Sequence, residues 1–130
     1  LEFQAEPAEK KQFDNALAVF RTGDFAAAQS SLLGFLLSYP SSGYASSALF
    51  WWGNAQYATK DYKESMINFR KLLNIAPLHT RAPEAMLAIS NCLVELKDMK
   101  AARKAMEDLI KAHPNSDAAQ TAKDRLSRLK

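Results

Sequence analysis

A unit of 37 residues occurs three times along this chain, and apolar, small, acidic and proline residues mark it at fixed positions. The recurring positions are Asp24, Asp61 and Asp98; Ala28, Ser65 and Ala102; Leu32, Phe69 and Met106; Phe35, Leu72 and Leu109; and Pro40, Pro77 and Pro114. Self-similarity at a fixed period is the signature of a solenoid, in which similar supersecondary units stack on one another.

Each unit reads as two helices joined by a tight turn. In the second unit, apolar residues recur at helical spacing before and after a break at residues 60–61. Asp61 with Glu64 three residues later has the spacing of a capping box at the start of the second helix. Gly23 precedes the first such start, where a left-handed helix end is easy, whereas Lys60 and Lys97 take that position in the other units at a cost.

Each closing proline is followed by a new start signal. Ser42, Thr80 and Ser116 are the N-cap candidates, and an apolar stripe marks one more helix after the last of them. We expect a flexible segment at 1–8, for which vector-derived residues are one explanation, and a repeat domain at 9–130. Its units cover about 9–45, 46–82 and 83–115, and a capping helix covers 116–129. The predicted fold is all-α: a right-handed superhelix of three helical hairpins and a C-terminal cap.

Composition and charge fit this prediction and narrow the function classes. Hydrophobic residues make up 48% and charged residues 24% of the 130 residues, and the net charge is +3. Basic residues are interspersed with acidic ones and form no cluster, so nucleic-acid binding is not expected. The strongest apolar run, residues 49–52, is far shorter than the roughly 20 residues of a membrane-spanning helix, so no membrane insertion is expected.

No residues combine into a catalytic or metal-binding pattern. The single cysteine, Cys92, matches Ala18 and Ala55 in the other units, which indicates a small buried position rather than a reactive thiol. His79 and His113 are not at ligand spacing. We therefore predict no catalytic residues, no metal, no cofactor and no enzyme activity.

The repeat resembles the tetratricopeptide repeat, whose pattern includes a small residue, Ala-x3-Phe and a closing proline. In the second unit, Ser65, Phe69 and Pro77 occupy those positions, and Gly53 matches the small residue of the family's first helix. The departure is the period, which is 37 residues here and about 34 in the usual repeat. The resemblance implies a non-catalytic module that binds another protein or a peptide.

Four short segments narrow the resemblance further: residues 39–42, 48–53, 60–62 and 113–116. They are similar to the C-terminal domain of the Tol–Pal system family YbgF, also called CpoB. That resemblance implies a periplasmic adaptor whose partner is TolA and which helps to coordinate envelope constriction with peptidoglycan synthesis at division. It also implies a trimerising coiled coil ahead of this domain in the parent protein.

In the wider repeat family, ligands meet the first helices of the hairpins on the concave face. Matched by repeat position, the candidate binding residues are Phe13, Leu17, Phe20, Phe50, Asn54, Tyr57, Leu87, Asn91 and Val94. The Asn pair offers donors and acceptors to a peptide backbone, and the aromatic rings offer contact area. Packing between hairpins is the alternative explanation for the apolar members.

The sequence also bears on the kind of ligand, and it leaves two alternative functions open. A paired basic clamp for a terminal carboxylate is not visible at the matched positions, so a helix or an extended internal segment is the expected ligand. A subunit of an outer-membrane assembly complex is an alternative in the same binding class. A structural module that self-assembles through its terminal hairpins is an alternative in another class, against which the polar capping helix argues.

Overall fold

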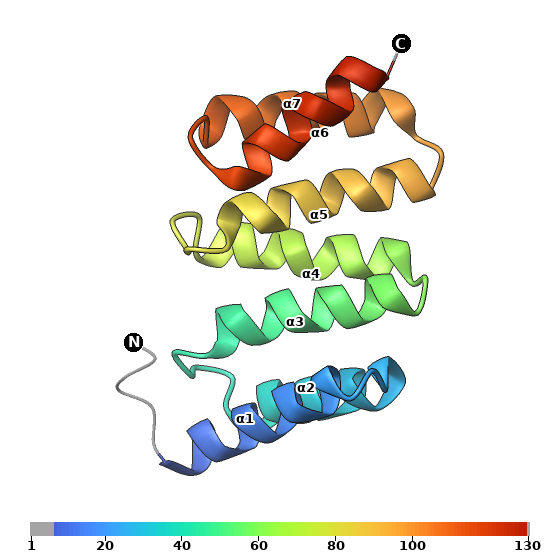
Figure 1. Cartoon of the computed structure of the whole chain (residues 1–130). Helices are drawn as coiled ribbons and strands as arrows, with labels where there is room; N and C mark the ends of the chain where they lie inside the picture. Colours follow the sequence, from blue (N-terminus) through green and yellow to red (C-terminus); the bar gives the residue numbers. More distant parts are fainter. Residues whose placement is uncertain (1–6, 130) are drawn as a thin grey trace.

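The computed structural model describes residues 7–129, which form seven α-helices connected by short turns (Figure 1). They are α1 (Pro7–Arg21), α2 (Phe25–Ser38), α3 (Ala45–Ala58), α4 (Tyr62–Ile75), α5 (Ala82–Glu95), α6 (Met99–Ala112) and α7 (Asp117–Arg128). The predicted superhelix of three hairpins and a capping helix is confirmed. Helix α1 begins at Pro7, two residues before the expected start of the domain, with proline in the first turn, where its missing N–H costs nothing.

The turn inside each hairpin depends on one residue with a positive φ. Gly23 has φ +86°, and Lys60 and Lys97 adopt the same left-handed conformation at φ 69° and 65°. The following N–H reaches back to the helix end: Asp61 N donates to Gln56 O at 2.8 Å, and Asp98 N donates to Leu93 O at 2.9 Å. These bonds satisfy carbonyls that the helix end leaves free, which offsets the strain at the two lysines.

Aspartate is the N-cap residue of the second helix in each hairpin, and its side chain makes the cap bond in two of the three. Asp24 and Asp98 each accept a hydrogen bond from a backbone N–H three residues later, both at 3.1 Å. Asp61 occupies the predicted N-cap position of α4, but its side chain makes no cap bond, because the Thr59 hydroxyl donates to its carboxylate at 2.6 Å. Thr59 is itself fixed by Gln29 of α2, whose amide donates to the Thr59 hydroxyl at 2.8 Å.

Of the three N-caps predicted at the starts of α3, α5 and α7, one is confirmed. Ser116 accepts from Ala119 N at 3.0 Å and caps α7 as expected. The predictions for Ser42 and Thr80 are wrong, because α3 and α5 begin after Tyr44 and Arg81, neither of which makes a side-chain cap bond. The Ser42 hydroxyl instead accepts from Tyr44 N at 3.0 Å, which closes a local turn ahead of the helix.

The helices form two layers. Among the described residues, α1 contacts α3, α3 contacts α5 and α5 contacts α7, whereas α2, α4 and α6 make no such contact with one another. In Figure 1, α1 and α7 accordingly lie on one side of the stack, in front of α2 and α6. We call the surface presented by α1, α3, α5 and α7 the inner face, which corresponds to the predicted concave face.

Small residues allow the two helices of each hairpin to approach closely. The first-helix positions Ala16, Gly53 and Ser90 are buried, and the second-helix positions Ala28, Ser65 and Ala102 are fully inaccessible. The tightest contact is in the middle hairpin, where a Cβ built on Gly53 would lie 2.8 Å from the Phe69 ring. Phe69 is itself fully buried, so its ring occupies the space that a side chain at position 53 would need.

A short chain of hydrogen bonds joins three helices at the same level. The Ser65 hydroxyl of α4 donates to Gly53 O of α3 at 2.7 Å, and Cys92 Sγ of α5 lies 3.5 Å from the Ser65 oxygen. Because the single Ser65 proton goes to the carbonyl, the Cys92 thiol is the donor of the second bond. Burial raises the pKa of the Cys92 thiol, so the fully buried sulfur stays protonated.

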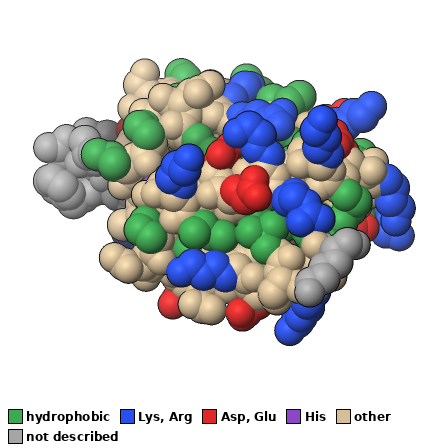
Figure 2. All heavy atoms as spheres, turned by 90° about the horizontal axis from the view of Figure 1, so that it is seen from above, with side chains coloured by type: hydrophobic (Ala, Val, Ile, Leu, Met, Phe, Trp, Pro, Cys, Tyr) green, Lys and Arg blue, Asp and Glu red, His purple; other side chains and the backbone are tan. Residues whose placement is uncertain are grey.

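The polarity of the surface rises along the stack. No charged residue occurs between Asp24 and Lys60, and the outward-facing Leu33 and Leu37 of α2 are 39% and 74% exposed. At the other end of the stack, Figure 2 shows basic side chains spread over the surface formed by α6 and α7, with fewer acidic ones among them. The last helix thus carries the polar outer surface expected of a cap.

Replacement of Gly53 by Ala should destabilise the domain by about 1–3 kcal/mol, because the added methyl group overpacks against Phe69. Gly34 is the matched control, since a Cβ there meets nothing within 4 Å and Ala is the better helix former by roughly 0.5–1 kcal/mol. Urea unfolding followed by circular dichroism measures both. Equal stability of Gly53→Ala and the wild type would contradict this account of hairpin packing.

The Cys92 thiol should react with a disulfide reagent at pH 8 at least about a hundredfold more slowly in the native domain than in the urea-unfolded chain, because access requires opening of the core. The raised pKa adds a pH dependence: the folded state prefers the protonated thiol, so stability should fall as pH rises above the ordinary value of 9.0. Fast labelling of the native protein would refute the buried position.

Candidate functional site

The nine predicted binding residues lie on α1, α3 and α5, and the structure separates them by depth. Phe13 and Phe50 are buried, with 5% and 4% of their surface exposed. The other seven, namely Leu17, Phe20, Asn54, Tyr57, Leu87, Asn91 and Val94, are partly exposed along the inner face. Their role in binding stays a prediction, and only these seven can offer a partner much surface.

Phe13 and Phe50 are held in the core by neighbouring rings. Phe13 stacks on Tyr44 at 4.7 Å between ring centroids and meets Phe35 at 5.4 Å. Phe50 meets Phe69 edge to face at 5.8 Å, and the guanidinium of Arg81 lies 5.1 Å from its ring centroid. Packing between hairpins, the alternative to a role in binding, therefore explains the positions of Phe13 and Phe50.

The two asparagines are engaged in different ways. Asn54 donates from its side-chain amide to Phe50 O, one turn earlier in α3, at 2.9 Å. Asn91 on α5 accepts, through Oδ1, a hydrogen bond from the guanidinium of Arg125 on α7. The side-chain oxygen of Asn54 and the amide of Asn91 are therefore the groups that remain to meet a peptide backbone.

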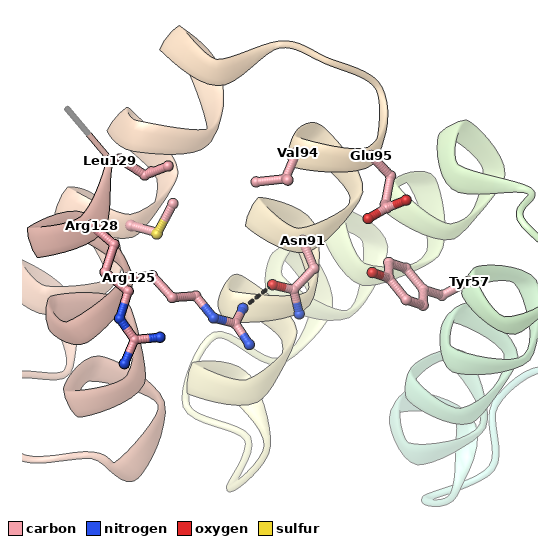
Figure 3. Close-up of a pocket in the computed structure, with 8 residues that line it drawn as sticks. Tyr57, Asn91, Val94, Glu95, Arg125, Arg128 and Leu129 are labelled. Carbon is pink, nitrogen blue, oxygen red and sulfur yellow. Dashed lines mark hydrogen bonds between the residues drawn. The ribbon is translucent and has the colours of Figure 1, made fainter.

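A pocket of about 360 Å³ lies at the C-terminal end of the inner face, between α3, α5 and α7 (Figure 3). We call it the C-terminal pocket. Its lining includes the predicted Tyr57, Asn91 and Val94 together with Met106, Arg125, Arg128 and Leu129. Figure 3 shows Arg125 reaching from α7 to Asn91, with Arg128 beside it and Tyr57 on the opposite side. Apolar and cationic groups thus share one wall.

The acidic residue of this pocket is Glu95. It accepts a hydrogen bond from the Tyr62 hydroxyl at 3.3 Å, and the Tyr62 ring meets Tyr57 edge to face at 5.2 Å. Burial, followed by the nearby charge of Glu95, raises the pKa of Tyr57 above its ordinary value. The Tyr57 phenol therefore remains a neutral hydrogen-bond donor at physiological pH.

A second pocket, of about 650 Å³, lies toward the N-terminal end of the inner face, and we call it the N-terminal pocket. It includes Leu17 and Arg21 of α1, Trp51 of α3, and Leu78 and Arg81 between α4 and α5. Leu78 is 92% exposed at its edge. A smaller pocket adjoins it at Leu17, Arg21 and Trp51 and also includes Phe20.

Trp51 joins two hairpins beside the N-terminal pocket. Its ring meets Phe20 of α1 edge to face at 5.2 Å, and the guanidinium of Arg81 lies 5.0 Å from its centroid. Arg81 also forms an ion pair with Glu84 at 3.2 Å. Trp51 is thus partly packed between hairpins and partly exposed, and it lines the N-terminal pocket.

Sequence reasoning missed the two arginines of α7, Arg125 and Arg128, because the absence of a paired basic clamp was predicted only for the matched positions of the three hairpins. The same 37-residue register carries the position of Leu17, Asn54 and Asn91 on to Arg128. Arg125 lies one turn before Arg128 in α7, at the repeat position of Trp51 and Ala88. The signal for both arginines thus lies in the same register, extended from the three hairpins into the capping helix.

The contact between the Ser47 and His79 side chains is not arranged for nucleophilic catalysis. Ser47 Oγ lies 3.4 Å from His79 Nε2, and His79 Nδ1 accepts from Arg81 N at 3.0 Å. Because Nδ1 is an acceptor, a neutral imidazole carries its proton on Nε2 and donates it to the serine, so it cannot remove the serine proton.

The described part of the chain also lacks a metal-binding cluster and a membrane-spanning helix. No group of three or more His, Cys, Asp and Glu side chains is placed to hold a metal ion within it. Nor does any helix in residues 7–129 have the length and apolar character needed to cross a membrane.

Solved structures of low sequence identity share this fold. PcrH of Pseudomonas aeruginosa, in complex with the chaperone binding region of PopD, has a TM-score of 0.79 at 13% identity, with 99% of this chain and 96% of that chain covered. SycD, a type III secretion chaperone of Yersinia enterocolitica in complex with a peptide of YopD, has a TM-score of 0.76 at 13% identity, with 96% of this chain and 91% of that chain covered. The tetratricopeptide domain of Sgt2 from Aspergillus fumigatus has a TM-score of 0.76 at 18% identity, with 95% of this chain and 80% of that chain covered.

These likenesses establish a tetratricopeptide-type fold, and the sequence comparison adds the family. No curated protein shows significant sequence similarity to the chain. Residues 5–130 match the model of the YfiO family, described as outer membrane lipoprotein. Because the match spans nearly the whole sequence, the chain belongs to the YfiO family of outer membrane lipoproteins.

Proposed function

We propose that this domain is a non-catalytic adaptor of the bacterial cell envelope that binds a segment of a partner protein along its inner face. The observation that carries the proposal is a row of partly exposed residues on that face, which runs from Leu17 in the N-terminal pocket through Asn54 to Tyr57 and Asn91 in the C-terminal pocket. Rings and aliphatic groups supply contact area there, and asparagine, tyrosine and arginine side chains supply hydrogen bonds, a combination typical of peptide grooves.

The related folds support a protein segment as the ligand. PcrH and SycD share the fold, and their structures contain the chaperone binding region of PopD and a peptide of YopD. A segment of a partner, rather than a small metabolite, is accordingly the ligand that we propose for this chain.

Within the envelope, we assign the domain to the periplasm and to the Tol–Pal system, with TolA as its partner. Support comes from the segments at 39–42, 48–53, 60–62 and 113–116, which are similar to those of the YbgF family. In that role the domain would help to coordinate peptidoglycan synthesis with constriction of the envelope at division.

The second candidate is a subunit of an outer-membrane assembly complex, and the match to an outer membrane lipoprotein family favours it. The two candidates differ in what precedes the domain in its parent protein. A predicted trimeric coiled coil favours the Tol–Pal adaptor, whereas a lipidated cysteine near the mature N-terminus favours the assembly subunit.

Calorimetric titration with the periplasmic region of TolA from the same genome should show saturable binding. The variant Asn54→Ala/Asn91→Ala should weaken it by about tenfold, since each amide contributes roughly 0.5–1.5 kcal/mol when it bonds a peptide backbone. Asn74→Ala on the exposed surface of α4 is the matched control and should bind as the wild type does.

Two results would contradict parts of the proposal. Binding that the Asn54→Ala/Asn91→Ala variant leaves unchanged would move the site off the inner face and keep TolA as the partner. Absence of heat at high concentration, with helical content intact, would exclude TolA, and the assembly complex would then be the partner to test.

A further inference from the structure

The arginines of the chain are unevenly distributed over its surface. Of six arginines, Arg125 and Arg128 line the C-terminal pocket, and Arg21 and Arg81 line the N-terminal pocket. Lysine is nearly twice as frequent in the sequence, yet no lysine side chain of residues 7–129 lines either pocket or the smaller one beside Phe20. The inner face therefore presents guanidinium groups at both of its ends.

Arg125 and Arg128 are available to a ligand. Both side chains are exposed, and neither forms an ion pair with a carboxylate within residues 7–129. Asn91 holds one nitrogen of Arg125 through a neutral oxygen, which orients the guanidinium without neutralising its charge. The acidic group of this pocket, Glu95, instead accepts from the Tyr62 hydroxyl. The C-terminal pocket thus has an excess of positive charge.

The N-terminal pocket repeats the arrangement in weaker form. Arg21 is exposed there and has no carboxylate partner in the described residues. Arg81 is already neutralised by Glu84 and lies against Phe50 and Trp51, so its part is to shape the pocket wall. Within the described part of the chain, no acidic side chain lines this pocket.

We propose, on the basis of the function proposed above, that the inner face selects an acidic and apolar internal segment of its partner. One carboxylate side chain of that segment lies between Arg125 and Arg128, and a neighbouring apolar side chain packs on Tyr57, Val94 and Leu129 of the same pocket. A second carboxylate, toward the other end of the segment, meets Arg21.

Three observations decide the chemistry of this ligand. A guanidinium fork matches a planar carboxylate with two parallel hydrogen bonds, which a lysine ammonium cannot do. The apolar residues that share the C-terminal pocket with the two arginines favour a peptide over a polyphosphate, which would leave Val94 and Leu129 without a partner. Unpaired arginines at both ends call for carboxylates at two places, whereas a chain terminus brings only one.

A display library of short random peptides, fused at their C-termini so that no free carboxylate is present, provides the probe. Panning on the wild-type domain should enrich Asp or Glu next to Leu, Val or Phe. Enriched sequences are then made as acetylated and amidated peptides, and their dissociation constants are measured by fluorescence anisotropy at several salt concentrations.

The decisive variant is Arg125→Gln/Arg128→Gln, which should weaken binding by about tenfold for each arginine that forms a charge-assisted bond and should flatten the salt dependence. Lys111→Gln/Lys123→Gln removes the same charge from exposed positions outside the pockets and should change affinity by less than about twofold. Circular dichroism and thermal melting verify that both variants fold.

Each other outcome rejects a defined part of the account. Selected peptides that lack acidic residues, or that bind Arg125→Gln/Arg128→Gln as tightly as the wild type, would overturn the acidic segment and leave the adaptor function standing. Binding that requires a free C-terminal carboxyl group, tested with the same peptides left unamidated, would overturn the internal position. Failure to enrich any peptide would count against both this inference and the proposed function.

Discussion

The close approach of paired helices at the small-residue positions is the constraint on which the rest of the structure depends. At Gly53 the Phe69 ring of α4 comes so near to the backbone of α3 that a methyl group would not fit. Ala16 and Ser90 do the same for the other hairpins, and the Ser65 hydroxyl joins the layers by its bonds to Gly53 and Cys92. Hairpins held in this way stack with one pitch, so equivalent positions of α1, α3, α5 and α7 fall on one inner face.

The periodic part of the structure could be predicted from the sequence, because the 37-residue register records it directly. Helix order, hairpin turns and even the left-handed Lys60 and Lys97 follow from comparing each unit with the others. Local competition could not be predicted: Asp61 resembles the capping Asp24 and Asp98 in sequence, yet Thr59 donates to it. That bond depends on Gln29 from another hairpin, which no comparison of equivalent positions includes.

In the candidate binding site, too, the repeat register predicts some features and not others. The register gave the direction in which Phe13 and Phe50 point but not their depth, which is set by Tyr44 from a turn and by Arg81 from the next hairpin. Arg125 and Arg128 show the opposite case, in which the register extends into α7 and would have identified them. A capping helix that seals the core with alanines on one surface can present ligand-binding groups on another. In this domain, stability and recognition are thus assigned to different faces of the same helices.

The central claim is that partners bind the inner face, and amide chemical-shift mapping tests it most directly. The domain is small enough, at 14.5 kDa, for isotope-labelled spectra with and without the periplasmic region of TolA. The account predicts that perturbed amides lie on α1, α3, α5 and α7, with the largest changes around Asn54, Asn91 and Arg128. Perturbations confined to the outer surfaces of α2, α4 and α6 would contradict it, whatever the affinity.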